Sequence, residues 1–204
     1  MTQAIRWRII VLQVLAVLVL GFAAGGALYA HAFIDDQVQQ QLAPQQIYFP
    51  ATAQQGLPAS LRSFAGQQVL TGAQAHAYAE QFIGLHLRAI GQGHPYAYWS
   101  GLALREPDPA AKAHDQALAD TLFKGETLKS LLNTAWTLWV IGQLAFYAFL
   151  GLLVATLVVL ATLIFELIEV RRGTETARAI IIIRPDRETR ATTAPMSSEQ
   201  AAIS

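Results

Sequence analysis

Two long runs of hydrophobic residues interrupt an otherwise mixed pattern of polar and apolar positions. Residues 9–30 have Gln13 as their only strongly polar side chain, and residues 140–165 carry no charge. At a rise of about 1.5 Å per residue, each run can cross a hydrocarbon layer of about 30 Å as a helix. The pattern predicts a first transmembrane helix over residues 9–32, and a helix over residues 131–170 that contains the second span.

The end of the first run offers an alternative, because Ala30, His31 and Ala32 form a small–x–small triplet of the kind that signal peptidases cut. The hydrophobic part of a signal peptide is usually only about 7–15 residues long. The greater length of the run here favours a retained anchor, with the triplet at the exit of the helix.

The segment between the runs, residues 33–130, shows helical periodicity. Apolar positions recur every three or four residues over 72–90, after a Thr71–Gln74 capping box. A shorter helical piece is expected near residues 60–65. Because no alternating run of β-branched residues occurs in this segment, we expect a small all-α domain.

A second helix of this domain is predicted to start at the Asp108–Pro109 pair and to end at Gly125. Glu126 then begins a helix that continues into the second span. Between the predicted helices lie Tyr96, Tyr98 and Trp99, which pack on the core in the favoured interpretation; the alternatives are contact with the membrane surface or with a partner.

The flanking charges predict the orientation. Arg6 and Arg8 precede the first run, and short Arg-rich flanks stay in the cytoplasm. We therefore expect residues 1–8 and the tail, residues 171–204, to be cytoplasmic and residues 33–130 to be extracytoplasmic. The arginines that follow the second run are Arg171, Arg172, Arg178, Arg184, Arg187 and Arg190.

The tail contains a run of isoleucines that is too short to cross a membrane. It could form a strand that adds to the sheet edge of a partner, or it could lie on the membrane surface between arginines. From Glu188 the tail is polar and contains proline, which predicts disorder. The isoleucines are Ile180, Ile181, Ile182 and Ile183.

Small residues recur in both runs and predict close helix packing, because helices in lipid associate through close van der Waals contact. Gly21 and Gly25 form a GxxxG pattern in the first run. Gly142, Ala145 and Ala148 recur at helical spacing in the second. The two stripes could meet within one chain or between copies.

Composition and motifs give little sign of chemistry. The chain has 204 residues, no cysteine and a formal net charge of zero, so disulfides, thiolate sites and nucleic-acid binding are not indicated. The hydrophobic runs hold no ionisable side chain at mid-depth, which argues against an ion pathway. His86 and His114 fall on apolar helix faces that could meet, and they are weak metal candidates. No catalytic motif is present, and we expect neither an enzyme nor a cofactor.

Two stretches resemble a family of uncharacterised two-pass membrane proteins of actinobacteria: GQQVLTGAQAHAYAEQFIGLHLRAI (residues 66–90) and DTLFKGETLKSLLNTAW (residues 120–136). The likeness extends over about residues 5–170. It implies a bacterial plasma membrane and a helical outer domain, and it carries no activity to transfer.

The sequence thus favours an all-α membrane protein that works without catalysis, as an accessory or scaffolding subunit. Its expected partners are the lipid bilayer and either other membrane subunits or copies of itself. The alternatives are an extracytoplasmic sensor that signals through a separate protein, and an oligomeric two-helix pore with a hydrophobic gate.

Overall fold

The computed structural model describes residues 3–183, and the side chains of residues 4–172. Over these residues the chain is helical and holds no strand, apart from an isolated bridge between Tyr48 and Gln68. The chain divides into two compact units. One joins Met1–Gly21 with Leu153–Ser204, and the other is Phe22–Leu152.

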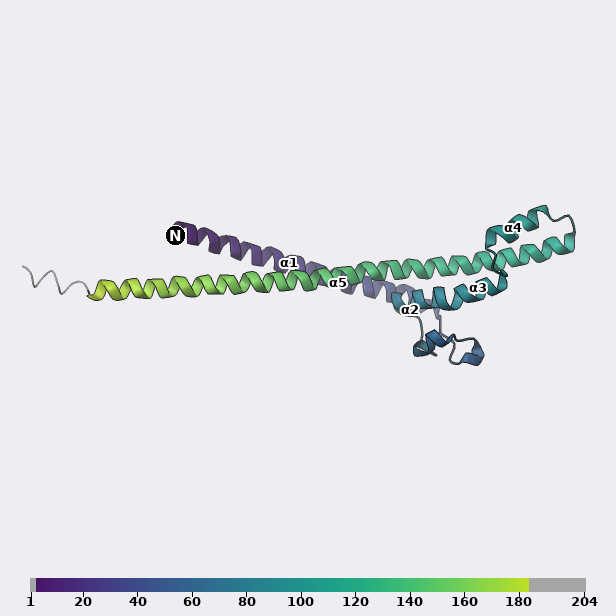
Figure 1. Ribbon diagram of the computed structural model, residues 1–204, viewed down its shortest axis with the longest axis horizontal. Coiled ribbons are helices and arrows are strands. Elements are labelled where there is room, and N and C mark those ends of the chain that lie inside the picture. The colour runs from purple at the N-terminus through teal and green to yellow at the C-terminus, as the bar shows by residue number, and fades with distance from the viewer. Residues whose placement is uncertain (1–2, 184–204) are drawn as a thin grey trace, which may run out of the picture. The chain divides into compact units, whose positions relative to one another are not determined.

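Two long helices dominate the described residues (Figure 1): α1, Gln3–Leu42, and α5, Pro109–Ile183. Both are long and apolar enough to cross a membrane, with mean hydropathy of 2.5 and 2.7 in their most apolar windows. Only 11% and 6% of those windows are buried inside the protein. The core helix of a water-soluble protein would be mostly buried, so their low burial distinguishes these helices from such a core helix.

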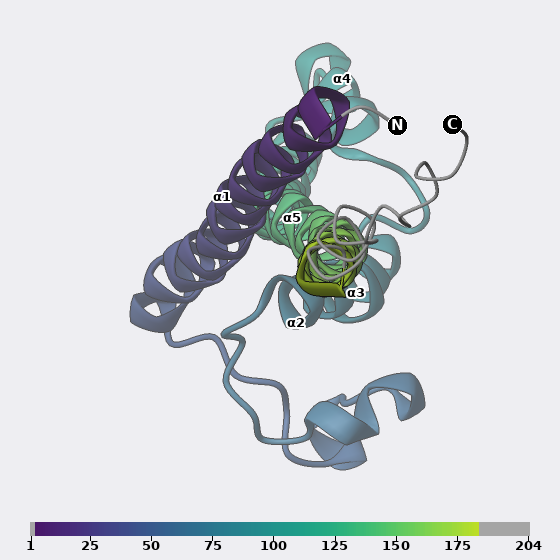
Figure 2. The same cartoon turned by 90° about the vertical axis from the view of Figure 1, so that its left-hand side faces the viewer.

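The second unit contains a helical module, residues 34–139, with one hydrophobic core. Figure 2 shows the backbone of its short helices. Besides the end of α1 and the first part of α5, the module consists of short helices. These are η1 (Ala43–Gln45), η2 (Ala53–Gln55), η3 (Ala59–Phe64), α2 (Gly72–Ala77), the π-helical η4 (Tyr78–Ile83), α3 (Gly84–Ile90) and α4 (Tyr96–Arg105). The most deeply buried side chains include Val38, Phe49, Leu61, Val69 and Leu122.

The segments α2, η4 and α3 follow one another without a break, and this helix lies antiparallel to α5. It starts with the predicted capping box, in which Thr71 accepts a hydrogen bond from the Gln74 amide. A Cβ on Gly72 would overlap Trp139, and a Cβ on Gly125 would overlap Leu87. The helices therefore touch closely near both ends of their contact.

A π-helical turn lies in the middle of this helix, where the Gly84 N–H donates to the Ala79 carbonyl five residues back. The residues that face α5 are spaced by four: Gly72, His76, Glu80 and Gly84. In an ideal α-helix such a row rotates by about 40° per step, because one turn takes about 3.6 residues. The wider π turn compensates for this rotation and keeps the row directed at α5.

Two helix starts are as the sequence predicts, whereas α1 extends at both ends beyond the predicted residues 9–32. The Ala111 N–H donates to Asp108 Oδ2 over 2.9 Å at the start of α5, and η3 occupies the expected short helical piece. The predicted helix end at Gly125 is wrong, since α5 runs through this residue without interruption. Gly125 is needed there for its missing side chain, which allows Leu87 to approach.

Two further segments differ from expectation. The aromatic segment after Pro95 is the helix α4, not a connecting loop. Residues Ile180–Ile183 belong to α5, which continues well past the expected helix end at residue 170, so the strand, one of the two alternatives for these residues, does not form here. The disorder predicted from Glu188 onward concerns residues outside the described part of the chain.

We predict that Gly125→Ala destabilises the module by about 1–3 kcal/mol, because the new methyl group overlaps the buried Leu87 side chain. Gly151→Ala in the same helix is the matched control, since a Cβ there meets nothing within 4 Å. It should stabilise α5 by up to about 1 kcal/mol through helix propensity. Thermal unfolding of the purified Gly125→Ala and Gly151→Ala variants checks the prediction. Equal melting temperatures of the two variants would contradict the close contact between Gly125 and Leu87.

Candidate functional site

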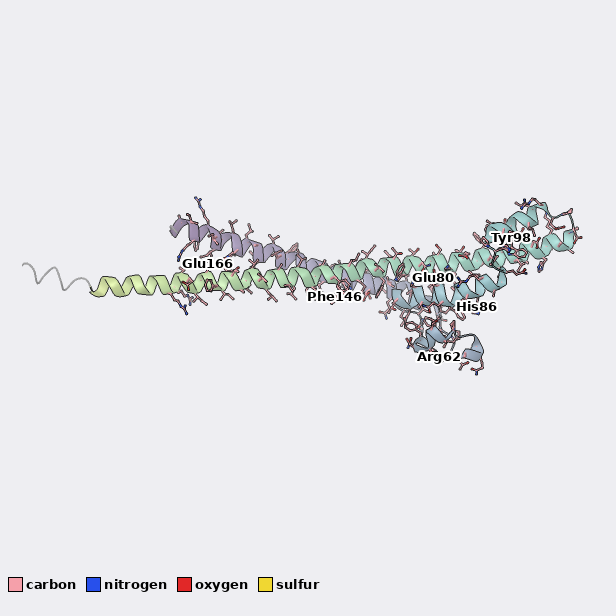
Figure 3. The ribbon with its side chains drawn as sticks, viewed as in Figure 1. Arg62, Glu80, His86, Tyr98, Phe146 and Glu166 are labelled. Atoms are coloured by element: carbon pink, nitrogen blue, oxygen red, sulfur yellow. The ribbon has the colours of Figure 1, made fainter. Side chains whose placement is uncertain are left out.

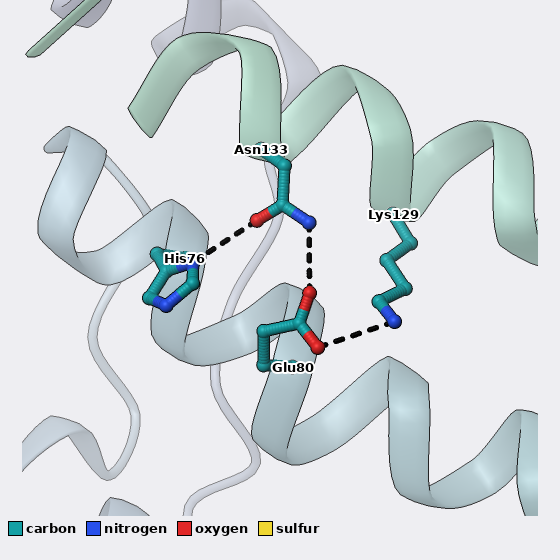
Figure 4. A network of polar contacts seen from close by, with 4 residues as sticks. All are labelled: His76, Glu80, Lys129 and Asn133. Carbon is teal, nitrogen blue, oxygen red and sulfur yellow. Dashed lines mark hydrogen bonds and ion pairs between the residues drawn. The ribbon is translucent and has the colours of Figure 1, made fainter. Parts of the chain in front are cut away.

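The continuous helix formed by α2, η4 and α3 is called the π-bearing helix below. A network of four polar side chains joins it to α5 (Figure 4). Asn133 is its centre: its Nδ2 donates to Glu80 Oε1 over 2.8 Å, and its Oδ1 lies 3.0 Å from His76 Nδ1. Lys129 Nζ forms an ion pair with Glu80 Oε2 at 3.2 Å. The His76 ring stacks on Trp136, with 4.2 Å between ring centroids. All four residues are only partly buried.

The chemistry of the network fixes its donors. An ionised carboxylate can only accept hydrogen bonds, so Asn133 must direct its NH2 group at Glu80. The Asn133 Oδ1 is then an acceptor, and His76 must carry its proton on Nδ1. The hydrogen bond from Asn133 and the nearby Lys129 ammonium lower the pKa of Glu80 below its ordinary value of 4.5.

A small polar recess adjoins this network. Its volume is about 170 Å³, and Glu80 and Lys129 line one side. Oppositely charged groups face it in equal number, so its charge favours neither a simple anion nor a cation. The other lining residues are Gly84, Leu87, Arg88, Gly93, His94, Pro95, Leu122 and Glu126.

The expectation that His86 and His114 lie on apolar faces that pack together is not met, because neither side chain is buried. Both side chains are exposed, and among the described residues no group of three or more His, Asp or Glu could hold a metal ion. His86 instead bonds through Nδ1 to the Phe82 carbonyl over 2.8 Å. The π turn explains the error, because it rotates the residues after it away from the face that an ideal helical period predicts. Figure 3 shows His86 and Glu80 on this helix.

The small residues of the two apolar helices behave differently from one another. A Cβ on Gly142 would lie 3.1 Å from Ile34 Cγ2, so α1 and α5 pack closely there. A Cβ on Gly21 or Gly25 would meet nothing within 4 Å. Within the described residues the GxxxG pattern is therefore not used for packing. Ala145 is half-buried, and Ala148 is exposed.

Polar groups also pair between the two apolar helices, and each unit provides an example among the described residues. Gln13 Nε2 donates to Thr162 Oγ1 over 3.4 Å. In the other unit, His31 Nδ1 lies 3.1 Å from the Gly142 carbonyl, and its ring lies 5.0 Å from that of Phe146. Each of these hydrogen bonds lowers the cost of a polar group within an apolar segment.

The aromatic residues near α4 divide between core and surface. Trp99 is buried and donates from Nε1 to the Gly91 carbonyl over 3.0 Å, as core packing requires. Tyr96 and Tyr98 remain 40% and 42% exposed. Tyr96 packs on the exposed Phe123 at 5.5 Å between ring centroids. A recess of about 330 Å³ follows, lined by Tyr96, Phe123, Glu126, Thr127, Ser130 and Leu131.

Sequence reasoning did not identify the polar network, although its signal was present. His76 and Glu80 are four residues apart, and so are Lys129 and Asn133. Residues at this spacing share a helix face. Two such pairs on helices that pack together could have indicated the contact; the pairing between the two helices could not be read from spacing alone.

Fold and site together define a class of protein. It is largely helical, it has two helices long and apolar enough to cross a membrane, and it contains a helical module with a polar network. Comparisons with family models, with curated proteins and with solved structures find no match for the chain.

We predict that Glu80→Gln lowers the free energy of unfolding near neutral pH. The variant should also lose less stability than the wild type when the pH is lowered. The folded-state pKa of Glu80 is lowered, so its contribution is present above the ordinary value of 4.5 and disappears as pH falls through the lowered value. Because the Glu80 side chain is 39% exposed, the effect should not exceed about 1 kcal/mol.

Unfolding free energies measured from neutral pH to pH values below the ordinary pKa of Glu80 check this prediction. Glu126→Gln is the control, because Glu126 is an exposed acid with no ion pair among the described residues. A difference between the wild type and the Glu80→Gln variant that stays constant across the pH range would contradict the role given to Glu80.

Proposed function

We propose that the chain is an integral protein of a bacterial plasma membrane and acts, without catalysis, as an accessory or scaffolding subunit. In this proposal α1 and α5 each cross the bilayer, both termini are cytoplasmic, and the helical module is extracytoplasmic. The long apolar segments support the first point, and the arginines at both ends support the orientation. The resemblance described above agrees with the cellular location.

The observation that carries the scaffolding role is the exposed aromatic surface formed by Tyr96 and Phe123. Phe123 lies about 24 Å along the α5 axis from Trp139, at a rise of about 1.5 Å per residue. If Trp136 and Trp139 mark the membrane interface, bilayer lipid does not reach this surface. Exposed aromatic side chains beside a recess are typical anchors of protein–protein interfaces.

A sensor is the second candidate, and the unbroken course of α5 favours it. The helix contributes Ala119, Leu122 and Leu132 to the core of the module and continues through the second apolar segment to Ile183. A continuous helix can carry a change in the module toward the cytoplasmic end. The polar network, which holds the π-bearing helix on α5, would then be the place where such a change alters α5.

We predict that the protein, purified from its native membranes in mild detergent, carries a stoichiometric foreign subunit. Phe123→Ser should weaken this association about thirtyfold, because an aromatic anchor contributes about 2 kcal/mol or more. Leu104→Ser is the matched control: Leu104 is 78% exposed in α4 and lines none of the recesses described here. Recovery of the chain alone, or equal recovery from both variants, would contradict the proposal.

Self-association is tested separately through the unused glycines of α1. Gly21→Leu combined with Gly25→Leu should leave the fold intact, since both positions are open within the chain. If copies pair through α1, the double variant lowers their oligomeric state in detergent. Gly142→Leu should instead disturb the α1–α5 pair, because Ile34 lies against it. An oligomer unchanged in the double variant would rule out pairing through this face.

A further inference from the structure

An apolar groove lies where the end of α1 and the turn after it meet α5. Its volume is about 510 Å³, within the range of about 300–1,000 Å³ that is usual for small-molecule sites. Leu42, Leu132 and Ala135 are buried in its wall, whereas Leu128 and Leu131 remain 40% and 65% exposed. The remaining lining residues are Gln40, Gln41, Pro44, Gln45, Ile47 and Thr134.

The chemistry of the lining selects an uncharged ligand. Among the described residues none that lines the groove is ionisable. Gln40 already donates to Asp36, and the Thr134 hydroxyl donates to the Ser130 carbonyl. The amides of Gln41 and Gln45 make no hydrogen bond within the described residues and lie at the exposed rim. The groove therefore offers an aliphatic wall and, at its edge, neutral amide groups.

The position of the groove indicates where such a ligand comes from. Ala135 directly precedes Trp136, and Leu128 lies about 16 Å along the α5 axis from Trp139. With these tryptophans at the interface, the groove begins at the headgroup layer and extends away from the bilayer. Its wall continues the apolar surface of the span, since Leu138 and Ile141 are also exposed. An apolar chain can pass from the bilayer into it with little contact with water.

We infer that this groove binds one acyl chain of a lipid with an uncharged headgroup, drawn from the adjacent leaflet, with the headgroup at Gln41 and Gln45. The inference rests on the part of the proposed function that places α1 and α5 in a bilayer. A docked partner helix is the competing occupant. It is less suited to a recess walled on two sides by α1 and α5 than to the open aromatic surface at Tyr96 and Phe123.

Photolabelling of the full chain in vesicles tests the inference. The vesicles contain phosphatidylethanolamine and phosphatidylglycerol with a trace of diacylglycerol whose chain ends in a diazirine. After illumination, mass spectrometry should locate crosslinks at Leu128, Leu131 or Leu132, in addition to crosslinks on the spans. Phosphatidylglycerol with the same labelled chain should crosslink the groove at least about tenfold less, because no cationic side chain lines it.

Two variants separate the groove from a change of fold. Leu128→Arg places a charge at a partly exposed wall position and should reduce groove labelling about tenfold while leaving span labelling unchanged. Gln41→Glu alters only the rim and should reduce labelling by a smaller factor. Leu104→Arg, on an exposed position of α4 outside the groove, should label like the wild type.

The outcomes distinguish this inference from the proposed function. Crosslinks on the spans without any at Leu128–Leu132 would overturn the lipid groove and leave membrane insertion standing. Absence of crosslinks on both the groove and the spans would overturn membrane insertion itself. A co-purified protein crosslinked to the groove in place of the lipid would show that the occupant is a partner helix, and would also overturn the inference.

Discussion

The antiparallel contact between the π-bearing helix and α5 is the interaction on which the helical module depends. At its two ends the helices touch through Gly72 against Trp139 and Gly125 against Leu87. A glycine that receives a large side chain of the opposite helix fixes both the separation and the register of the two helices. Between these points the polar network joins the same two elements, so a shift in register would break hydrogen bonds as well as packing.

The polar network depends on the π turn, because the turn directs Glu80 toward α5. Two residues spaced by four share a face of an α-helix, but a row of several such steps drifts by about 40° per step, so the row that contains Glu80 would otherwise rotate away from α5. The π turn holds Glu80 toward α5, at the cost of poorer local hydrogen-bond geometry. The ion pair and the hydrogen bonds of Glu80 offset part of that cost. Partly exposed ion pairs contribute little stability, so their main effect here is to specify register.

Sequence patterns predicted the elements governed by local rules. The capping box at Thr71, the start of α5 after Asp108 and the buried Trp99 all follow from short-range chemistry. The errors arose where a distant residue determines the outcome. Gly125 resembles a helix stop until Leu87 is known to lie against it, and His86 lies on the predicted apolar face only if the helix has no π turn.

The candidate sites are even harder to predict from local sequence patterns, because they are formed by residues that are distant in the chain. The aromatic surface brings Tyr96 of α4 together with Phe123 of α5, and the apolar groove brings Ile47 together with Leu132. No periodicity links residues so far apart in the chain, so neither surface can be read from the sequence. Both nevertheless depend on α5, which supplies one wall of each. Because α5 carries a long apolar segment on one stretch and residues of the module core on another, it retains an apolar wall between them. The groove occupies this stretch, because neither the module core nor the span covers Leu128 and Leu131 completely.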